Sequence, residues 1–213
     1  MKPVFSFPFV FILLVVSAAG PVRGQEVLDT SGNPVEAGVQ YYIIPAKSGN
    51  GGGLVPSSRT FNPQQLCPLD VVQSPLPFIP GLPVTFTVLN SADNVLQLNT
   101  NLNVQFESTV WLCPETKVWK GEDFENTDEY AYISTGGEIG GPNSWFRVLK
   151  FVDDYKLVFC KDGTTCHYVG TYNDGFGVQR LVVGHEILAV KFQKVSGTSV
   201  EAEKMMPRMF PAY

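Results

Sequence analysis

The chain has 213 residues, 44% of them hydrophobic and 12% aromatic, with a formal net charge of −5 at pH 7. A chain of this length and composition can bury a large core within one domain. Its acidic balance and its lack of a basic run argue against binding to nucleic acid or to anionic membrane surfaces, because both are bound through lysine and arginine.

The first 24 residues have the pattern of a secretory signal peptide. Lys2 gives a basic start, residues 4–19 are apolar and free of charge, and Gly24 provides a small residue for cleavage. No later segment reaches the ~18 apolar residues of a membrane span. We therefore expect a mature chain of residues 25–213, with a formal charge of −7, in an extracellular or vacuolar location.

The four cysteines form an even set, which in a secreted chain predicts two disulfides. Cys160 and Cys166 flank a short segment with an Asp-Gly turn, so we expect them to pair with each other and Cys67 to pair with Cys113. The longer bridge would close around residues 82–106. A zinc site is the alternative, but the CxxC spacing and paired histidines typical of zinc are absent from the sequence.

Short alternating or apolar runs follow one another from Gln25 onward, separated by segments rich in glycine, proline and asparagine. This pattern predicts an all-β barrel or sandwich, and no long stretch has helical periodicity with caps at both ends. A strand, a polar turn and an aromatic-bearing strand recur three times with a period of about 60 residues, which a threefold barrel would need. A tail at 202–213 falls outside the pattern and is expected to be loose. Strands are predicted at 40–44, 70–73, 84–88, 102–106, 110–113, 130–134, 145–151, 157–160, 178–183 and 188–195.

The segment between the strands at 84–88 and 102–106 has thirteen residues and contains neither glycine nor proline. A loop of that length without turn residues is uncommon in a compact domain and is usually functional or mobile. At its centre, Leu96 and Leu98 flank Gln97. We expect this loop to be presented to a partner. The alternative is that the two leucines pack back onto the barrel.

Other candidate chemistry is weaker. The chain has two histidines, both in expected turns, and no G-x-S-x-G motif, so we predict no enzymatic activity and no cofactor. The acidic residues within 122–129 lack the glycine and the terminal glutamate of a calcium loop, so we expect a solvated loop and no metal site. Core packing is expected for Trp111 and Trp145, and exposure for Trp119.

Three sequence blocks carry a family resemblance: residues 27–35 (VLDTSGNPV), residues 67–73 (CPLDVVQ) and residues 155–160 (YKLVFC). In this order they resemble the plant Kunitz inhibitors of the soybean trypsin inhibitor type, including the miraculin-like branch. The resemblance covers nearly all of the mature chain. It implies a β-trefoil of twelve strands in three pseudo-repeats, with the two disulfide pairs already expected.

The resemblance also implies a function, which is inhibition of a serine protease by an exposed loop that binds like a substrate. A rigid loop loses little conformational entropy on binding, so such complexes can be tight. In the branch that this sequence resembles, the loop falls within residues 90–100. The residue that enters the specificity pocket aligns with Gln97, and the scissile bond would be Gln97–Leu98, preceded by Leu96.

Two residues depart from the pattern of trypsin inhibitors. Gln97 is neutral where such an inhibitor has Arg or Lys to meet the buried aspartate of trypsin's pocket. Ala37 stands where inhibitors commonly have an asparagine that braces the loop. We therefore expect weak trypsin inhibition. A shift of register by one residue would place Leu96 or Leu98 in the pocket, which suits proteases of the chymotrypsin or elastase type.

The predicted partner is thus a protease, most readily a serine endopeptidase, bound by a monomer of this chain. Two alternatives stay open. One is a non-inhibitory storage or defence trefoil, and the other is inhibition of cysteine or aspartic proteases through another loop.

Overall fold

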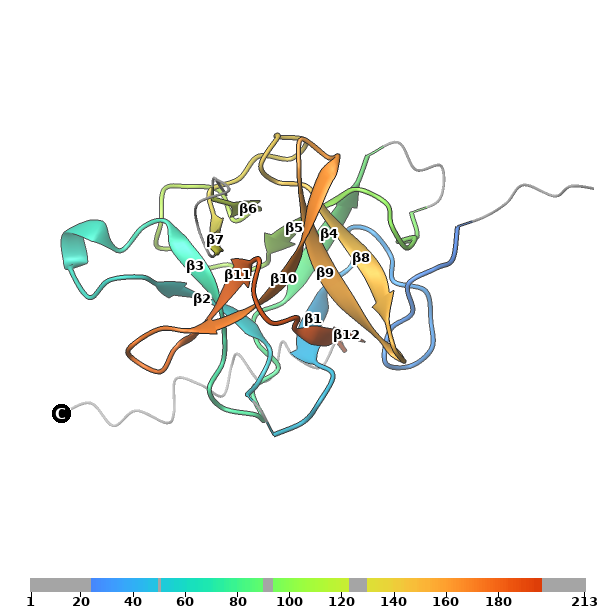
Figure 1. Cartoon of the computed structure of the whole chain (residues 1–213), viewed down its shortest axis with the longest axis horizontal. Helices are drawn as coiled ribbons and strands as arrows, with labels where there is room; N and C mark the ends of the chain where they lie inside the picture. The colour runs from blue at the N-terminus through green and yellow to red at the C-terminus, as the bar shows by residue number, and fades with distance from the viewer. Residues whose placement is uncertain (1–23, 50, 90–93, 123–129, 197–213) are drawn as a thin grey trace, which may run out of the picture.

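The computed structural model describes residues 24–49, 51–89, 94–122 and 130–196 (Figure 1). The predicted signal segment up to Arg23, the predicted tail at 202–213 and residues 90–93 of the expected loop lie outside the described residues. Within the described ranges, the structure has no helix long and apolar enough to cross a membrane.

The described chain folds into strands and one short 3-10 helix, η1 (Pro63–Gln65). The strands are β1 (Tyr41–Pro45), β2 (Leu54–Ser58), β3 (Leu69–Gln73), β4 (Val84–Val88), β5 (Leu102–Phe106), β6 (Trp119–Gly121), β7 (Ala131–Thr135), β8 (Phe146–Phe151), β9 (Asp154–Lys161), β10 (Thr165–Asn173), β11 (Gln179–Val183) and β12 (Ala189–Lys194).

Six of the strands close a barrel. They pair in the order β12-β1-β4-β5-β8-β9, and a further pairing of β12 with β9 completes the ring. The other six strands form the hairpins β2–β3, β6–β7 and β10–β11, and β3, β7 and β11 pair with one another. Each run of four consecutive strands thus supplies two barrel strands and one hairpin. This arrangement is the predicted β-trefoil.

Alternation of side chains along the barrel strands builds the core, as expected for strands with one buried face. Phe86 on β4 and Phe192 on β12 meet edge to face at 5.5 Å. Trp119 is fully buried, with its ring 5.2 Å from Phe106 and 6.1 Å from Phe146. The predicted exposure of Trp119 is therefore wrong, because β6 pairs with β7 and turns the indole into the barrel.

Both expected disulfides are present. Cys67 and Cys113 are joined with their Cα atoms 5.7 Å apart, and Cys160 and Cys166 with theirs 4.0 Å apart. The longer bridge ties the start of the β3 segment to the segment after β5. The shorter one closes the β9–β10 hairpin, in which the two cysteines are direct cross-strand neighbours.

The strand predicted at 110–113 is wrong. These residues form no strand, and the side chains of Val110 and Leu112 are 71% and 86% exposed. Trp111 is only partly buried, against the core at Phe106. The apolar run that suggested a strand instead contributes to a surface groove, described below.

A charged cluster lies among the hairpins. Asp70 on β3 is fully buried between two arginines: its carboxylate lies 2.7 Å from Arg59 Nη2 and 2.9 Å from Arg180 Nη1. Arg180 also binds Asp174 at 2.7 Å, and Arg59 binds Glu122 at 2.6 Å. Burial alone would raise the pKa of Asp174, but hydrogen bonds from backbone amides of the β10–β11 turn and from Arg180 hold it below its usual value.

Candidate functional site

The connection between β4 and β5, residues 89–101, is not a free loop over its described length. Leu96 donates its amide to Val35 O at 2.8 Å and accepts from the Val27 amide at 2.9 Å. Isolated β-bridges join Gln97 to Glu26 and Val95 to Glu36. Residues 94–98 therefore lie as a middle strand between two arms of the amino-terminal segment, the blue chain beside the green connection in Figure 1.

Leu96 is fully buried and belongs to the hydrophobic core. The expectation that Leu96 is presented on an exposed loop is therefore wrong. The alternative considered for the leucines, packing back onto the barrel, describes Leu96 correctly, and Leu98 is partly buried against the same core. The physical reason is that burying a leucine stabilises the fold by about 1.5–3 kcal/mol, and the pairing with residues 25–37 satisfies the backbone at no loss of hydrogen bonds.

The peptide bond between Gln97 and Leu98 is covered by the start of the described chain. The Leu98 amide donates to Gln25 O at 2.8 Å. The Gln97 side chain lies against Gly24, where an added Cβ would come within 2.7 Å of Gln97 Oε1. A protease that binds a substrate-like loop needs free backbone on either side of the bond it attacks, and here that backbone is already paired. The expectation of weak trypsin inhibition rested on Gln97 in the pocket and on Ala37 in place of a bracing asparagine, and it stays a prediction.

The exposed part of the connection lies before Val95. Leu89 is 40% exposed, and Asn94 is exposed. The Ala37 amide donates to Asn94 O at 2.7 Å, so Ala37 lies at the base of the connection, as the resemblance implied. Its methyl group can make no side-chain hydrogen bond to the connection. Here the bracing comes from the backbone of residues 25–37.

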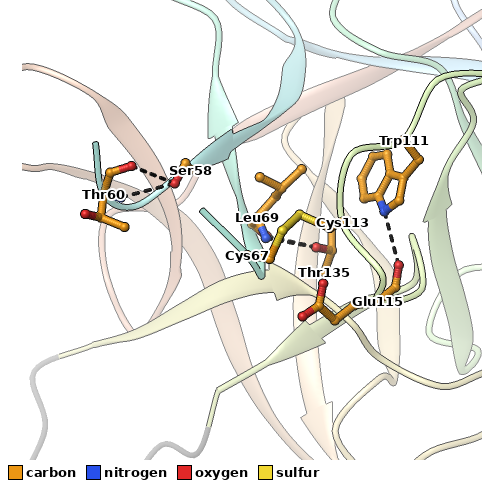
Figure 2. Close-up of a disulfide and its surroundings, with 8 residues drawn as sticks. All are labelled: Ser58, Thr60, Cys67, Leu69, Trp111, Cys113, Glu115 and Thr135. Atoms are coloured by element: carbon orange, nitrogen blue, oxygen red, sulfur yellow. Dashed lines mark hydrogen bonds between the residues drawn. A yellow bond between two sulfur atoms is a disulfide. The ribbon is translucent and has the colours of Figure 1, made fainter. Parts of the chain in front are cut away.

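A second candidate site is a groove of about 850 Å³ beside the Cys67–Cys113 disulfide. Its walls come from β2, η1 and the segment after β5, and they are mainly apolar, with Leu66, Val110 and Leu112 exposed along it. Figure 2 shows Trp111 next to the disulfide, where its Nε1 donates to Glu115 O at 3.1 Å. One carboxylate oxygen of Glu115 is buried there without a hydrogen-bond partner.

The same corner holds one group of potential metal ligands, formed by Cys67, Cys113 and Glu115. The two sulfurs are joined in the disulfide, so neither is available as a thiolate. The groove is therefore suited to an apolar ligand and not to a metal ion. The apolar run at 110–113, interpreted above as a strand, is the sequence signal of this groove.

Comparison with known proteins agrees with the fold. The family model described as "Trypsin and protease inhibitor", of the legume Kunitz type, matches residues 27–194. Kunitz trypsin inhibitor 3 of Arabidopsis thaliana is 45% identical over 204 residues, which cover 93% of this chain and 91% of that protein.

Two solved structures extend the comparison. Soybean trypsin inhibitor aligns with a TM-score of 0.67 at 31% identity, covering 80% of this chain and all of that one. The water-soluble chlorophyll protein of Brassica oleracea var. Botrytis, solved with chlorophyll b, aligns with a TM-score of 0.69 at 35% identity and covers 81% of this chain and 99% of that one.

Proposed function

Because the chain belongs to the plant Kunitz family of trypsin and protease inhibitors, we propose that it inhibits a serine endopeptidase through the β4–β5 connection. The Kunitz inhibitors to which this chain is similar are not enzymes, and this chain is not an enzyme either. The proposal includes action outside the cytosol, after removal of residues 1–24. The observation that carries it is the fixed strand 94–98, held on both edges and anchored by Leu96 in the core.

The mechanism follows from this rigidity. A connection that is already paired and anchored has little conformational freedom left to lose when a protease binds, so more of the contact energy contributes to affinity. If the protease attacks a bond of this connection, the new amino end stays close to the cut, because it leads into residues 94–98, which are held by the amino-terminal arms. The two ends can then rejoin before water hydrolyses the intermediate and before the cleaved product leaves the protease. Because Gln97–Leu98 is covered, we expect the attacked bond to lie on the amino-terminal side of Val95.

The test is a titration of the mature, oxidised protein against trypsin, chymotrypsin and elastase, followed by mass spectrometry of the protein after long incubation with a trace of the inhibited protease. We expect stoichiometric inhibition of at least one protease and a single cleaved bond between Leu89 and Val95. The variant Gln97→Arg is the matched control. It should bring no gain in trypsin affinity, because the backbone around Gln97 stays paired with Gln25 and Glu26 in the mature chain. Cleavage at Gln97–Leu98, or no inhibition at micromolar protein, would contradict the proposal.

The groove beside Cys67–Cys113 supports a second candidate function, binding of a chlorophyll-type tetrapyrrole. About 850 Å³ of mainly apolar space with a few polar groups is typical of a site for a large, flat, apolar ligand. The residues present fit such a ring through Leu66, Val110 and Leu112, which would cover its faces and keep water from them. When bound, the pigment would supply light absorption. The chain's part is to hold and shield it.

This second candidate is tested by mixing the protein with chlorophyll b and separating bound from free pigment by gel filtration, with absorption as the readout. We expect pigment to travel with the protein and Leu112→Asp to abolish this by placing a charge in the groove. Leu76→Asp is the control, because Leu76 is 48% exposed and does not itself line the groove. Equal pigment binding by both variants would rule out the groove as the site.

A further inference from the structure

Arg147 lies on β8 between Phe146 and Val148, which are both fully buried in the barrel. Alternation along the strand therefore turns the Arg147 side chain outward, toward the end of the β4–β5 connection. On its other side lies the turn of the β9–β10 hairpin. The guanidinium thus stands between two segments far apart in sequence.

Each of the three guanidinium nitrogens of Arg147 donates one hydrogen bond to these two segments. Its Nε donates to Asn101 Oδ1 at 2.6 Å and its Nη1 to Asn99 Oδ1 at 3.1 Å, both on the connection. Its Nη2 donates to Gly163 O at 2.8 Å, in the hairpin turn. The Asn101 amide donates to the same carbonyl at 3.1 Å. A single planar group thereby fixes two asparagines and one backbone carbonyl in one arrangement.

The asparagines matter because the connection turns sharply into β5 at this point. Asn99 has a φ of 59°, a left-handed conformation that asparagine tolerates better than most residues. Its amide donates to Val148 O at 2.9 Å. The turn therefore depends on contacts from β8, and the fork of Arg147 is the contact that holds both asparagine side chains.

The hairpin turn is itself fixed. The Cys160–Cys166 disulfide closes it, and Gly163 has a φ of 70° with no space for a side chain, since a Cβ would lie 2.7 Å from Asn101 Nδ2. The Gly163 carbonyl is thus a rigid acceptor for both Arg147 and Asn101. Contacts from the hairpin reach the connection directly through Asn101 and indirectly through Arg147.

We propose that Arg147 is a positioning residue for the inhibitory connection and that the Cys160–Cys166 hairpin acts on the connection through Arg147 as well as through Asn101. The amino-terminal arms hold residues 94–98 along their edges, and the Arg147 fork holds the exit at Asn99 and Asn101. We call the contacts of Arg147 with Asn99, Asn101 and Gly163 the brace. Its role in inhibition rests on the proposed function, but its role in holding the connection does not depend on which protease is inhibited.

The test compares Arg147→Lys with Arg59→Lys. Each exchange keeps the charge and replaces a fork by a single ammonium. Arg59 serves as the control because its fork binds Asp70 and Glu122, among the hairpins and away from the connection. The readouts are amide hydrogen exchange over residues 94–101, thermal unfolding, and the inhibition constant with its rate of loop cleavage. The double variant Cys160→Ser/Cys166→Ser is measured alone and together with Arg147→Lys.

For Arg147→Lys we expect about tenfold faster exchange at residues 98–101, with inhibition weakened about tenfold and faster cleavage of the connection. Arg59→Lys should lower thermal stability without either change. The cysteine variant should have the same effect as Arg147→Lys, and combining the two should add less than their sum.

Unchanged exchange in Arg147→Lys would overturn the brace, whatever the inhibition result. Faster exchange in a protein that inhibits no serine protease would support the brace and contradict the proposed function. Equal effects of Arg59→Lys and Arg147→Lys on exchange at 98–101 would also overturn it, because the change would then reflect general loss of stability.

Discussion

Replacing Asp70 with alanine is expected to lower the free energy of unfolding by about 3–5 kcal/mol, the range for breaking a buried ion pair by removing one partner. Asp70 is fully buried and is the carboxylate that Arg59 and Arg180 share. Without it, two guanidinium groups face each other across the space it leaves, and Arg180 stays buried with Asp174 as its remaining acidic partner. Urea unfolding of the oxidised protein measures the loss.

The control for this prediction is Asp153→Ala, which removes the same charge from an exposed position. It should change the free energy of unfolding by no more than about 0.5 kcal/mol. A similar small loss for Asp70→Ala would mean that the arginines find other partners and that the buried cluster does not determine the packing of the hairpins. Because β3 and β11 carry Asp70 and Arg180, the expected loss reports on how the hairpins hold together.

Replacing Leu96 with alanine is expected to cost about 2–5 kcal/mol of unfolding free energy, as for other large-to-small changes in a core. Leu96 is fully buried and ties the connection to the barrel core. The change removes its packing and leaves a cavity under the strand formed by residues 94–98. We also expect weaker inhibition, because the connection would lose its anchor as well as its rigidity.

Leu112→Ala is the matched control, since Leu112 is 86% exposed. It should shift the unfolding free energy by no more than about 0.5 kcal/mol. If the two leucine variants behaved alike, Leu96 would not be the anchor described. If Leu96→Ala lost stability but kept full inhibition, the connection would not be the contact surface for the protease.

The fold was largely predictable from local pattern. The strands at 84–88 and 102–106 match β4 and β5 at both ends, because alternation is clear where one face packs into a barrel. β2 was missed because Pro56 and two serines hide its alternation of apolar and polar residues. A proline is tolerated there because β2 is an edge strand that pairs only with β3. β10 was missed because many of its positions are exposed, so its sequence reads as a polar turn.

The site was less predictable, for a physical reason. The length of the 89–101 segment and its lack of turn residues identified it as unusual. Its two leucines were compatible with two outcomes, presentation to a partner or packing onto the barrel. Choosing between them required the partner segments at 25–27 and 35–36, which lie roughly 60 to 70 residues earlier in the chain. Pairing over that distance leaves no local pattern in the sequence. The Arg147 contacts were equally hidden, since each of their members is an ordinary surface residue by type.

The pairing of the amino-terminal arm with residues 96–98 has a consequence for how the protein must be made. Gln25 accepts the Leu98 amide, and Gln25 is the first residue left by the predicted cleavage after Gly24. An aminopeptidase that trimmed the chain to Asp29 would remove the bonds from Gln25 and Val27 together and uncover one edge of the connection. Batches with ragged amino termini should therefore differ in activity while sharing one fold. A purification tag fused directly before Gln25 would add chain at the same edge, so recombinant protein should be released with a native amino terminus before its inhibition is measured.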